Sequence, residues 1–269
     1  MKQSKAHVAA RRDEIVSLLE NWGKVSVAEL AGHFNVSMLT IRRDLDYLAE
    51  QHVLTRQYGM ATLLNPLGRP SGSHQIRANK VIAQEAARHI KDGDCIFINA
   101  SSTALNIINY ITAQDITVIT NNGKALLLDY QPNVSILLTG GEIRLPRSSM
   151  TGELALNCIR NVTATKCFLG TTGLSATYGL TSATAPEPAI NAMMIEHSRI
   201  HVIVADSSKL GRTSSFKYGS ADEIDLLITD SRATEQQMSL LKEAGVQNII
   251  KVDLTSAFSN KKTQLMMDS

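Results

Sequence analysis

The spacing of apolar positions changes along the chain, and the change predicts two domains. Near the start, Ile15, Leu18, Leu19 and Trp22 recur at i, i+3, i+4 and i+7, which is the stripe of an amphipathic helix. Further on, short and almost wholly apolar runs such as Ile116–Thr120 alternate with helical segments. Runs of that kind are typical of strands buried on both faces of a mostly parallel sheet. The pattern therefore predicts a small helical domain followed by an α/β domain.

Two capped helices are predicted directly after the first stripe. Ser26 is placed to cap a helix over Val27–Phe34, and Glu29 three residues later completes a capping box. After a short turn, Ser37 is placed to cap a second helix over Met38–Glu50. A helix pair joined by such a short turn is typical of a helix-turn-helix.

The second helix has an outward face suited to DNA. Its apolar stripe leaves Thr40, Arg42 and Arg43 outside, where Arg can bond guanine or phosphate and Thr can contact either. Polar and apolar residues then alternate over 52–61, as in a hairpin whose Arg56 lies along the DNA backbone. The predicted DNA-binding residues are Ser37, Thr40, Arg42, Arg43 and Arg56. A purely structural three-helix unit is the alternative, but it leaves the Arg pair and the wing unexplained.

The second part of the chain alternates strands and helices after a linker rich in Pro, Gly and Ser. The predicted strands are 95–99, Ile116–Thr120, Val134–Leu138, 166–169, 200–205, 226–229 and Asn248–Val252, and the predicted helices are 74–91, 103–111, 124–129, 188–198 and 235–244. The predicted domains are a winged helix-turn-helix over 1–62, a linker over 63–73, an α/β effector domain over 74–254 and a disordered tail over 255–269.

Polar loops follow several of the predicted strands, at the edge of a parallel sheet where ligands gather. They are Ser101-Ser102-Thr103, residues 120–122, residues 139–141 and residues 206–209, the last of which ends in Lys209. Each loop alone has an ordinary explanation as a cap or a turn. Hydroxyls, amides and one cation at a shared edge nevertheless favour a small phosphorylated polyol over structural capping.

Composition adds little bulk attraction for DNA and excludes several classes of protein. The formal net charge is +2 over 269 residues, so attraction to DNA depends on where the arginines stand. The 3 cysteines lack metal-ligand spacing and are expected to be reduced, as in a cytoplasmic protein. No apolar run approaches the roughly 20 residues of a membrane helix. We expect no metal, no cofactor and no membrane association.

The first domain resembles the winged helix-turn-helix of the DeoR family of bacterial sugar-responsive transcriptional regulators. The resemblance is carried by VSVAELAGHFNVSMLTIRRDL, followed by Leu54, Arg56 and Tyr58-Gly59. Met60 stands where the family usually has a second glycine. In the second domain it is carried by residues 80–83, Gly93-Asp94, Ser101-Ser102-Thr103, Thr120-Asn121, Gly140-Gly141, Gly170, residues 205–209 and residues 228–230.

The resemblance implies an effector domain similar to ribose-phosphate isomerases and related sugar-phosphate enzymes. It implies that Ser101, Ser102 and Thr103 hold phosphate, that Lys209 supplies positive charge, and that Asn121, Gly141 and Glu187 border the sugar. Ala100 replaces a usual glycine, and a left-handed backbone there would be strained. Thr171-Thr172-Gly173 replaces a segment that carries an Asp in the family.

These features predict a transcriptional regulator, a repressor of a carbohydrate-utilisation operon whose binding to double-stranded operator DNA is controlled by a phosphorylated sugar. A homo-oligomer is expected, because one small domain makes few base contacts. The alternative is a sugar-phosphate isomerase-like enzyme with a DNA-binding appendage. No Lys occurs between Cys167 and Lys209, where the related isomerases have one, so we expect no enzymatic activity.

Overall fold

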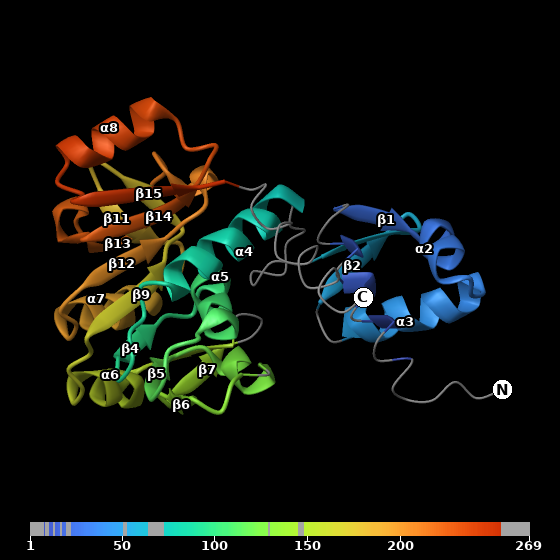
Figure 1. The fold of residues 1–269 in the computed structure, drawn as a ribbon, viewed down its shortest axis with the longest axis horizontal. Helices are drawn as coiled ribbons and strands as arrows, with labels where there is room; N and C mark the ends of the chain where they lie inside the picture. Colours follow the sequence, from blue (N-terminus) through green and yellow to red (C-terminus); the bar gives the residue numbers. More distant parts are fainter. Residues whose placement is uncertain are drawn as a thin grey trace, which may run out of the picture. The chain divides into compact units, whose positions relative to one another are not determined.

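The computed structural model divides the chain into two compact units, residues 1–77 and residues 78–269. The residues that it describes are Val8, 11–12, 14–16, 18–19, 23–50, 53–63, 73–128, 130–144 and 148–253. Figure 1 labels their helices and strands in chain order. The predicted tail at 255–269, most of the predicted linker and Trp22 lie outside the described residues. The predicted domain boundaries stay predictions.

The two capped helices that were predicted for the first unit are confirmed, with their caps. Helix α2 spans Val27–Phe34, and Ser26 and Glu29 form the reciprocal capping box at 3.1 and 2.8 Å. Helix α3 spans Met38–Glu50, and the amide of Thr40 donates to the Ser37 hydroxyl oxygen at 3.2 Å. The α2 helix ends at Asn35 in the left-handed conformation, with φ of 50°. The turn between the helices is therefore held by a left-handed backbone cap at the end of α2 and by a side-chain cap at the start of α3.

The wing contains one more strand than the sequence predicted. Strands β2 (Leu54–Gln57) and β3 (Met60–Leu63) form the expected hairpin, and β1 (Lys24–Ser26) pairs with β3 on its other side. The two loop residues, Tyr58 and Gly59, both have positive φ, at 51° and 78°. That combination is typical of a type I′ turn. Met60 lies within β3, so a glycine is not needed at that position.

The second unit is built on a seven-stranded parallel sheet. Its strands are β4 (Cys95–Ile98), β5 (Ile116–Thr120), β6 (Val134–Leu138), β9 (Lys166–Gly170), β12 (His201–Val204), β14 (Leu226–Asp230) and β15 (Asn248–Val252). Their order across the sheet is β15-β14-β12-β9-β4-β5-β6, and every neighbouring pair is parallel. All seven predicted strands are confirmed, each within one residue at both ends.

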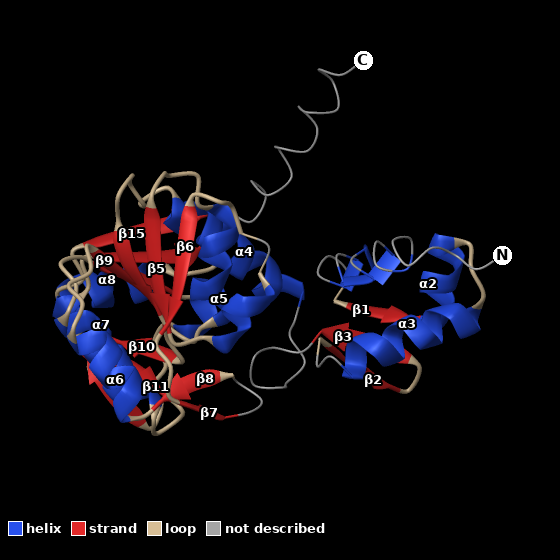
Figure 2. Ribbon diagram, turned by 90° about the horizontal axis from the view of Figure 1, so that it is seen from below, coloured by secondary structure: helices blue, strands red, loops and turns tan. Residues whose placement is uncertain are grey.

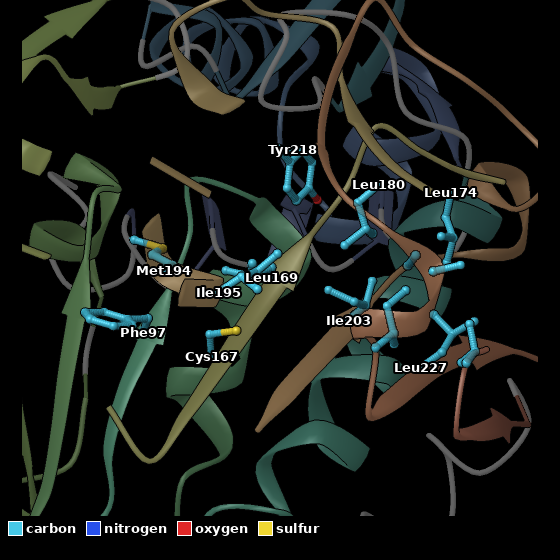
Figure 3. Close-up of a cluster of buried hydrophobic side chains, with 14 of the residues drawn as sticks. Phe97, Cys167, Leu169, Leu174, Leu180, Met194, Ile195, Ile203, Tyr218 and Leu227 are labelled. Carbon is cyan, nitrogen blue, oxygen red and sulfur yellow. The ribbon is translucent and has the colours of Figure 1, made fainter. Parts of the chain in front are cut away.

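Helices cover both faces of this sheet (Figure 2). Because side chains alternate along a strand, successive residues enter two different cores. On one face, α4 (Ser73–Ala87) and α5 (Ser102–Leu105) pack over Ile96, Ile98 and Phe168. On the other face, α6 (Glu153–Arg160), α7 (Glu187–Glu196) and α8 (Glu235–Glu243) cover the remaining strand side chains. Figure 3 shows this second core, in which Phe97, Cys167, Leu169, Ile203 and Leu227 share one side of the sheet.

Two predicted helices are wrong in type or length. The helix expected over 103–111 is a single α-turn, α5, continued by the 3-10 helix η1 (Asn106–Tyr110). The helix expected over 124–129 is the 3-10 helix η2 (Gly123–Leu127). Both segments begin with a side-chain cap and are too short to gain the cooperativity of a long α-helix. An anion site based on the dipole of a long helix after β4 is therefore not present.

Five strands of the second unit, all in antiparallel pairs, were not predicted from the sequence. An antiparallel sheet of β10 (Gly173–Ser175), β11 (Gly179–Ser182) and β13 (Phe216–Gly219) packs beside α7. A hairpin of β7 (Glu142–Arg144) and β8 (Ser149–Thr151) precedes α6.

Ala100 has no positive φ, so the backbone strain that was expected at that position does not arise.

Candidate DNA-binding surface and effector site

The exposed face of α3 carries the predicted DNA-binding arginines. Arg42 and Arg43 are both exposed, whereas Ile41 and Leu45 on the opposite face are completely buried. The Ser37 and Thr40 hydroxyls lie 2.9 Å apart at the start of the helix, and Thr40 is half-buried. Those two residues therefore order the first turn, whereas the two arginines form no ion pair with another described residue.

Asp44, directly after the two arginines, anchors α3 to the preceding helical segment. This role was not predicted from the sequence. It is 2% exposed, and its carboxylate oxygens accept from Arg11 at 2.7 Å and Arg12 at 2.9 Å. Arg12 also lies over the ring of Tyr47, 3.7 Å from its centroid. Buried charges require such pairing, and the pairing ties the first helical segment to α3. Of these three successive charged residues, two are therefore exposed and the third holds the helix in place.

Arg56 pairs with Asp46 of α3 by an ion pair between their side chains. The pair links the wing strand β2 to the exposed face of the recognition helix. Asp46 has a side chain 56% exposed, and its negative charge would repel phosphates if it were not neutralised. Arg56 therefore has a partner within the chain as well as its predicted one in DNA.

The predicted effector loops share the carboxyl edge of the parallel sheet. Ser101-Ser102-Thr103 follow β4, Asn121 follows β5, Gly141 follows β6 and Lys209 follows β12. The chain order reverses between β4 and β9, because β5 and β6 extend the sheet in one direction and β12, β14 and β15 in the other. Ligands of open α/β sheets bind in the crevice at such a switch point.

Ser101 lies at this switch point, against the end of β9. A Cβ atom built on Gly170 would come within 1.9 Å of the Ser101 hydroxyl oxygen, so only glycine permits this approach. The buried Asn99 holds the two strands together, because its oxygen accepts from the amides of Gly170 at 3.0 Å and Ser101 at 3.3 Å. The Ser101 hydroxyl also caps α5 by accepting from Ala104 at 3.4 Å.

The next loop along the edge contains buried polar atoms with unused bonding capacity. Asn121 is 1% exposed and donates to the carbonyl of Met150 at 3.1 Å, but its own oxygen has no partner among the described residues. The hydroxyl of Ser149, on the adjoining β8, also lacks a partner there. Gly141 packs against the same hairpin, since an added Cβ would lie 2.4 Å from the carbonyl oxygen of Thr151. Groups of this kind are candidates for ligand or water contacts.

Glu187 reaches the edge from α7 rather than from the sheet. Its carboxylate accepts from the Ser182 hydroxyl at 2.7 Å. One helical turn later, Asn191 is buried and accepts from the Asn99 amide at 3.1 Å, which connects α7 to the end of β4. Asn191 was missed in the sequence, although a lone Asn four residues after Glu187 on an apolar helix was a visible signal.

Thr171, in the loop after β9, uses its hydroxyl within the fold. That hydroxyl lies 2.9 Å from the carbonyl oxygens of both Gly173 and Thr181.

Lys209 ends the 3-10 helix η3 (Ser207–Lys209), one strand beyond β9 from Ser101. The loop is fixed from the neighbouring strand, because buried Asp230 accepts from the amide of Ser207 at 2.6 Å and from its hydroxyl at 3.0 Å. Lys209 is half-buried as a residue, and its ammonium group pairs with none of the described carboxylates. Asp230 therefore fixes the loop through Ser207 and leaves the positive charge of Lys209 without a neutralising carboxylate among the described residues.

Other chemistry is limited in the part of the chain that the structure describes. No three His, Cys, Asp or Glu residues are grouped there as metal ligands, and no helix there is long and apolar enough to cross a bilayer. Burial raises the pKa of the Cys167 thiol to about 12, so that thiol is a poor nucleophile.

A winged helix-turn-helix joined to an α/β unit with a polar carboxyl edge defines a DNA-binding regulator with a sensor domain. The family model described as the DeoR C terminal sensor domain matches residues 74–231, and the DeoR-like helix-turn-helix domain matches residues 11–66. The chain belongs to the DeoR family. It is a transcriptional regulator, as its relatives are.

The relatives match over almost their entire length. The glycerol-3-phosphate regulon repressor of Escherichia coli is 30% identical over 92% of this chain and 98% of the relative. The regulator GolR of Listeria innocua is 31% identical over 88% and 96%. The repressor GlcR of Bacillus subtilis is 30% identical over 88% and 93%. Ribose 5-phosphate isomerase from Plasmodium falciparum is a distant structural neighbour, with 15% identity over 49% of this chain and 51% of that one, and a TM-score of 0.35.

Proposed function

We propose that this regulator represses a carbohydrate-utilisation operon in the cytoplasm and leaves its operator when a phosphorylated sugar binds. The observation that carries the proposal is the pairing of two surfaces in one chain. Arg42 and Arg43 are exposed on an anchored helix, and the sensor domain has polar groups with unused bonding capacity at the carboxyl edge of its sheet. The relatives named as repressors support the same sign of control.

The DNA-binding part is tested by substituting the outward arginines. Arg42→Ala and Arg43→Ala should each weaken operator binding by about 1–3 kcal/mol if the side chain is bidentate to a base. If it contacts phosphate, the slope of log affinity against log salt should fall by about one. Arg88→Ala is the matched control, because that side chain is 75% exposed in the sensor domain. Unchanged affinity in both test variants, with the helices intact by circular dichroism, would contradict the assignment.

The role of Arg56 needs its own test because of its ion pair with Asp46. Arg56→Ala removes a DNA contact and also leaves Asp46 unneutralised beside the phosphates. Asp46→Asn removes only the negative charge and frees Arg56. If Arg56 contacts DNA, Arg56→Ala should weaken binding and Asp46→Asn should strengthen it, whereas equal affinity in all three proteins would exclude both roles.

The effector is proposed to bind across the switch point. Ser101, Ser102 and Thr103 would hold its phosphate with Lys209, while Asn121, Gly141 and Glu187 would border the sugar. Thermal-shift screening against phosphorylated sugars identifies the ligand, because binding to the folded state raises the apparent stability. Unphosphorylated sugars are the matched ligands, and an equal response to both would contradict a phosphate site.

Control of DNA binding follows from linkage. If the sugar phosphate lowers DNA affinity by some factor, commonly 5–150-fold, DNA must lower the affinity for the sugar phosphate by the same factor. Lys209→Ala and Ser102→Ala should leave DNA binding intact and blunt release by the ligand. Normal release in both variants would mean that the phosphate binds elsewhere.

Catalysis by the same site is the competing function. Isomerisation needs a positioned base and groups that stabilise an enediolate. In the loop after β9, Thr171 and Thr172 stand where the related enzymes have acids, and Glu187 is the remaining candidate base. We therefore expect binding without turnover. Product formation by the purified protein that is lost in Glu187→Gln would favour the enzyme.

A homo-oligomer is proposed because one winged domain makes too few base contacts for specific regulation. The sensor domain offers a surface for it beside β6, which is an edge strand of the sheet. Large exposed apolar side chains occur on β6 and on the elements before and after it in the chain, from η2 to α6: Leu126, Leu127, Leu137, Ile143 and Leu154. Sedimentation should show at least a dimer that Leu126→Arg with Leu127→Arg dissociates. A monomer that binds its operator tightly would contradict the proposal.

A further inference from the structure

Exposed large apolar side chains of the first unit occur only on its DNA-facing elements, among the residues that the structure describes. They are Met38, Leu39, Tyr47 and Tyr58. Three of them lie on α3, and the fourth is in the loop of the wing. No described residue of α2 or of the three strands adds another. This distribution differs from the scattered exposed leucines that are normal on protein surfaces.

Met38 and Leu39 occupy the first turn of α3 and have no role in the core. They are 52% and 57% exposed, whereas the buried face of the helix contains Ile41 and Leu45. Residues three and four apart share a helix face, so Leu39 lies beside the two arginines at positions 42 and 43. The apolar and the cationic side chains therefore form one surface.

Tyr47 is explained within the chain, but the apolar pair at the helix start is not. Arg12 lies over the Tyr47 ring at 3.7 Å, which gives that ring a partner. Neither Met38 nor Leu39 belongs to the buried core of the first unit or to the partly buried residues packed against it. Two large apolar groups held in water are unfavourable unless a partner covers them.

We propose that Met38 and Leu39 read thymine methyl groups in the operator. The inference rests on DNA binding by the winged helix-turn-helix and adds a specificity element to it. The first residues of a recognition helix contact base edges in the major groove, and the C5 methyl of thymine is the distinctive apolar feature there. An apolar pair beside an arginine pair thus selects thymine next to guanine.

The experiment measures the contribution of the thymine methyl group to binding, apart from every other feature of the base. The full-length protein is first used to select duplexes from a random pool. Each thymine of the selected duplex is then replaced in turn by deoxyuridine, which lacks only the methyl, and binding is measured by fluorescence anisotropy at one salt concentration. Removal of a contacted methyl should weaken binding by about four-fold, the equivalent of one buried methylene-sized group.

The decisive comparison is between protein variants on these duplexes. Leu39→Ala or Met38→Ala should weaken binding to the thymine duplex and lose the sensitivity to deoxyuridine at its own position, so that the two changes are not additive. Arg42→Ala should weaken binding and keep that sensitivity. Leu240→Ala, on α8 and 48% exposed, is the matched control and should change neither.

Three results would overturn the inference. A scan in which no deoxyuridine weakens binding would show that no methyl is read. A scan in which Leu39→Ala and Met38→Ala keep the full sensitivity would assign the methyl contact to other residues. Failure to select any duplex would contradict DNA binding itself, and so would remove the basis of the inference together with the proposed function.

Discussion

At the amino edge of the seven-stranded sheet Asp94 is fully bonded, whereas at the carboxyl edge Asn121 keeps an oxygen without a described partner. Asp94 accepts from the amide of Lys91 at 2.8 Å and the hydroxyl of Thr165 at 2.9 Å, and it pairs with buried Lys166. The hydroxyl of Thr229, near the end of β14, also has no partner within the described parts of the chain. The polar groups of Asp94 hold the fold at one edge, and we propose that the unpaired groups at the other edge bind a ligand.

The largest effect should come from breaking the amino edge. Asp94→Ala leaves Lys166, which is 8% exposed, as an uncompensated buried charge, so we expect a loss of about 3–5 kcal/mol in unfolding free energy. Urea denaturation of the sensor domain measures it. Asp92→Ala is the control in the same turn, because Asp92 is exposed and should cost no more than about 1 kcal/mol. An equal loss of unfolding free energy in Asp94→Ala and Asp92→Ala would mean that the bonds of Asp94 do not stabilise the amino edge of the sheet.

A smaller effect is expected where the two halves of the sheet meet at the carboxyl edge. Gly170→Ala forces its new methyl against Ser101, which should cost about 1–3 kcal/mol and abolish the thermal shift by the effector. Ser101→Gly removes both atoms in the clash. The double variant should therefore regain stability but not effector binding. If Gly170→Ala still binds the effector normally, Ser101 is not part of the site.

Asn121→Ala should separate stability from binding most clearly. It removes one hydrogen bond, to the Met150 carbonyl, and a carbonyl oxygen that was unpaired, so we expect at most about 1 kcal/mol of destabilisation. The thermal shift by the sugar phosphate should nevertheless be lost. Asn161→Ala is the control, an exposed Asn that also donates to a backbone carbonyl, of Asn157. A large loss of stability in Asn121→Ala would place that residue with the structural edge.

The smallest effect is a dependence of stability on pH. Burial alone raises the pKa of Asp94, but hydrogen bonds from Lys166, Lys91 and Thr165 outweigh it and hold the pKa below the ordinary value of 3.8. Because the folded-state pKa is the lower one, the contribution to stability is present above pH 3.8 and is lost as pH falls through the folded-state value. Urea titrations from pH 6 to pH 3 should show a decline that is reduced in Asp94→Asn. An identical decline in that variant would contradict the lowered pKa.

Local signals in the sequence were enough for the parallel sheet and the helix pair. The apolar runs of β5, β6 and β15 and the capping box of α2 could be read directly, because each depends on residues close in the chain. The antiparallel sheet could not be predicted in this way, since β11 contains buried Thr181 and Ser182 and lacks an apolar run. Helix α6 had a signal that was overlooked, namely Ala155 and Ile159 at i, i+4.

The candidate site could be predicted as an edge but not as a set of contacts. Parallel strands bring their following loops together, so Ser101, Asn121 and Lys209 could be assigned to one edge from strand order. The bonds that fix those loops join residues far apart in the chain. Asn99 bonds Asn191, and Asp230 bonds Ser207. A single sequence contains no local pattern for such pairs, and the same is true of Asp44 with Arg11.

The pairing of β4 with β9 also determines the order in which the chain can fold as it is synthesised. The first unit closes its last strand at Leu63, whereas Asn99 must wait for Gly170, 71 residues later, before the central seam of the sheet can form. Domains fold as units from the amino terminus, and long-range parallel pairing is slow. During synthesis on the ribosome, the winged helix-turn-helix unit is therefore expected to fold before the sensor domain. A truncated mRNA that ends between these two points would yield the winged helix-turn-helix unit without a complete sensor domain.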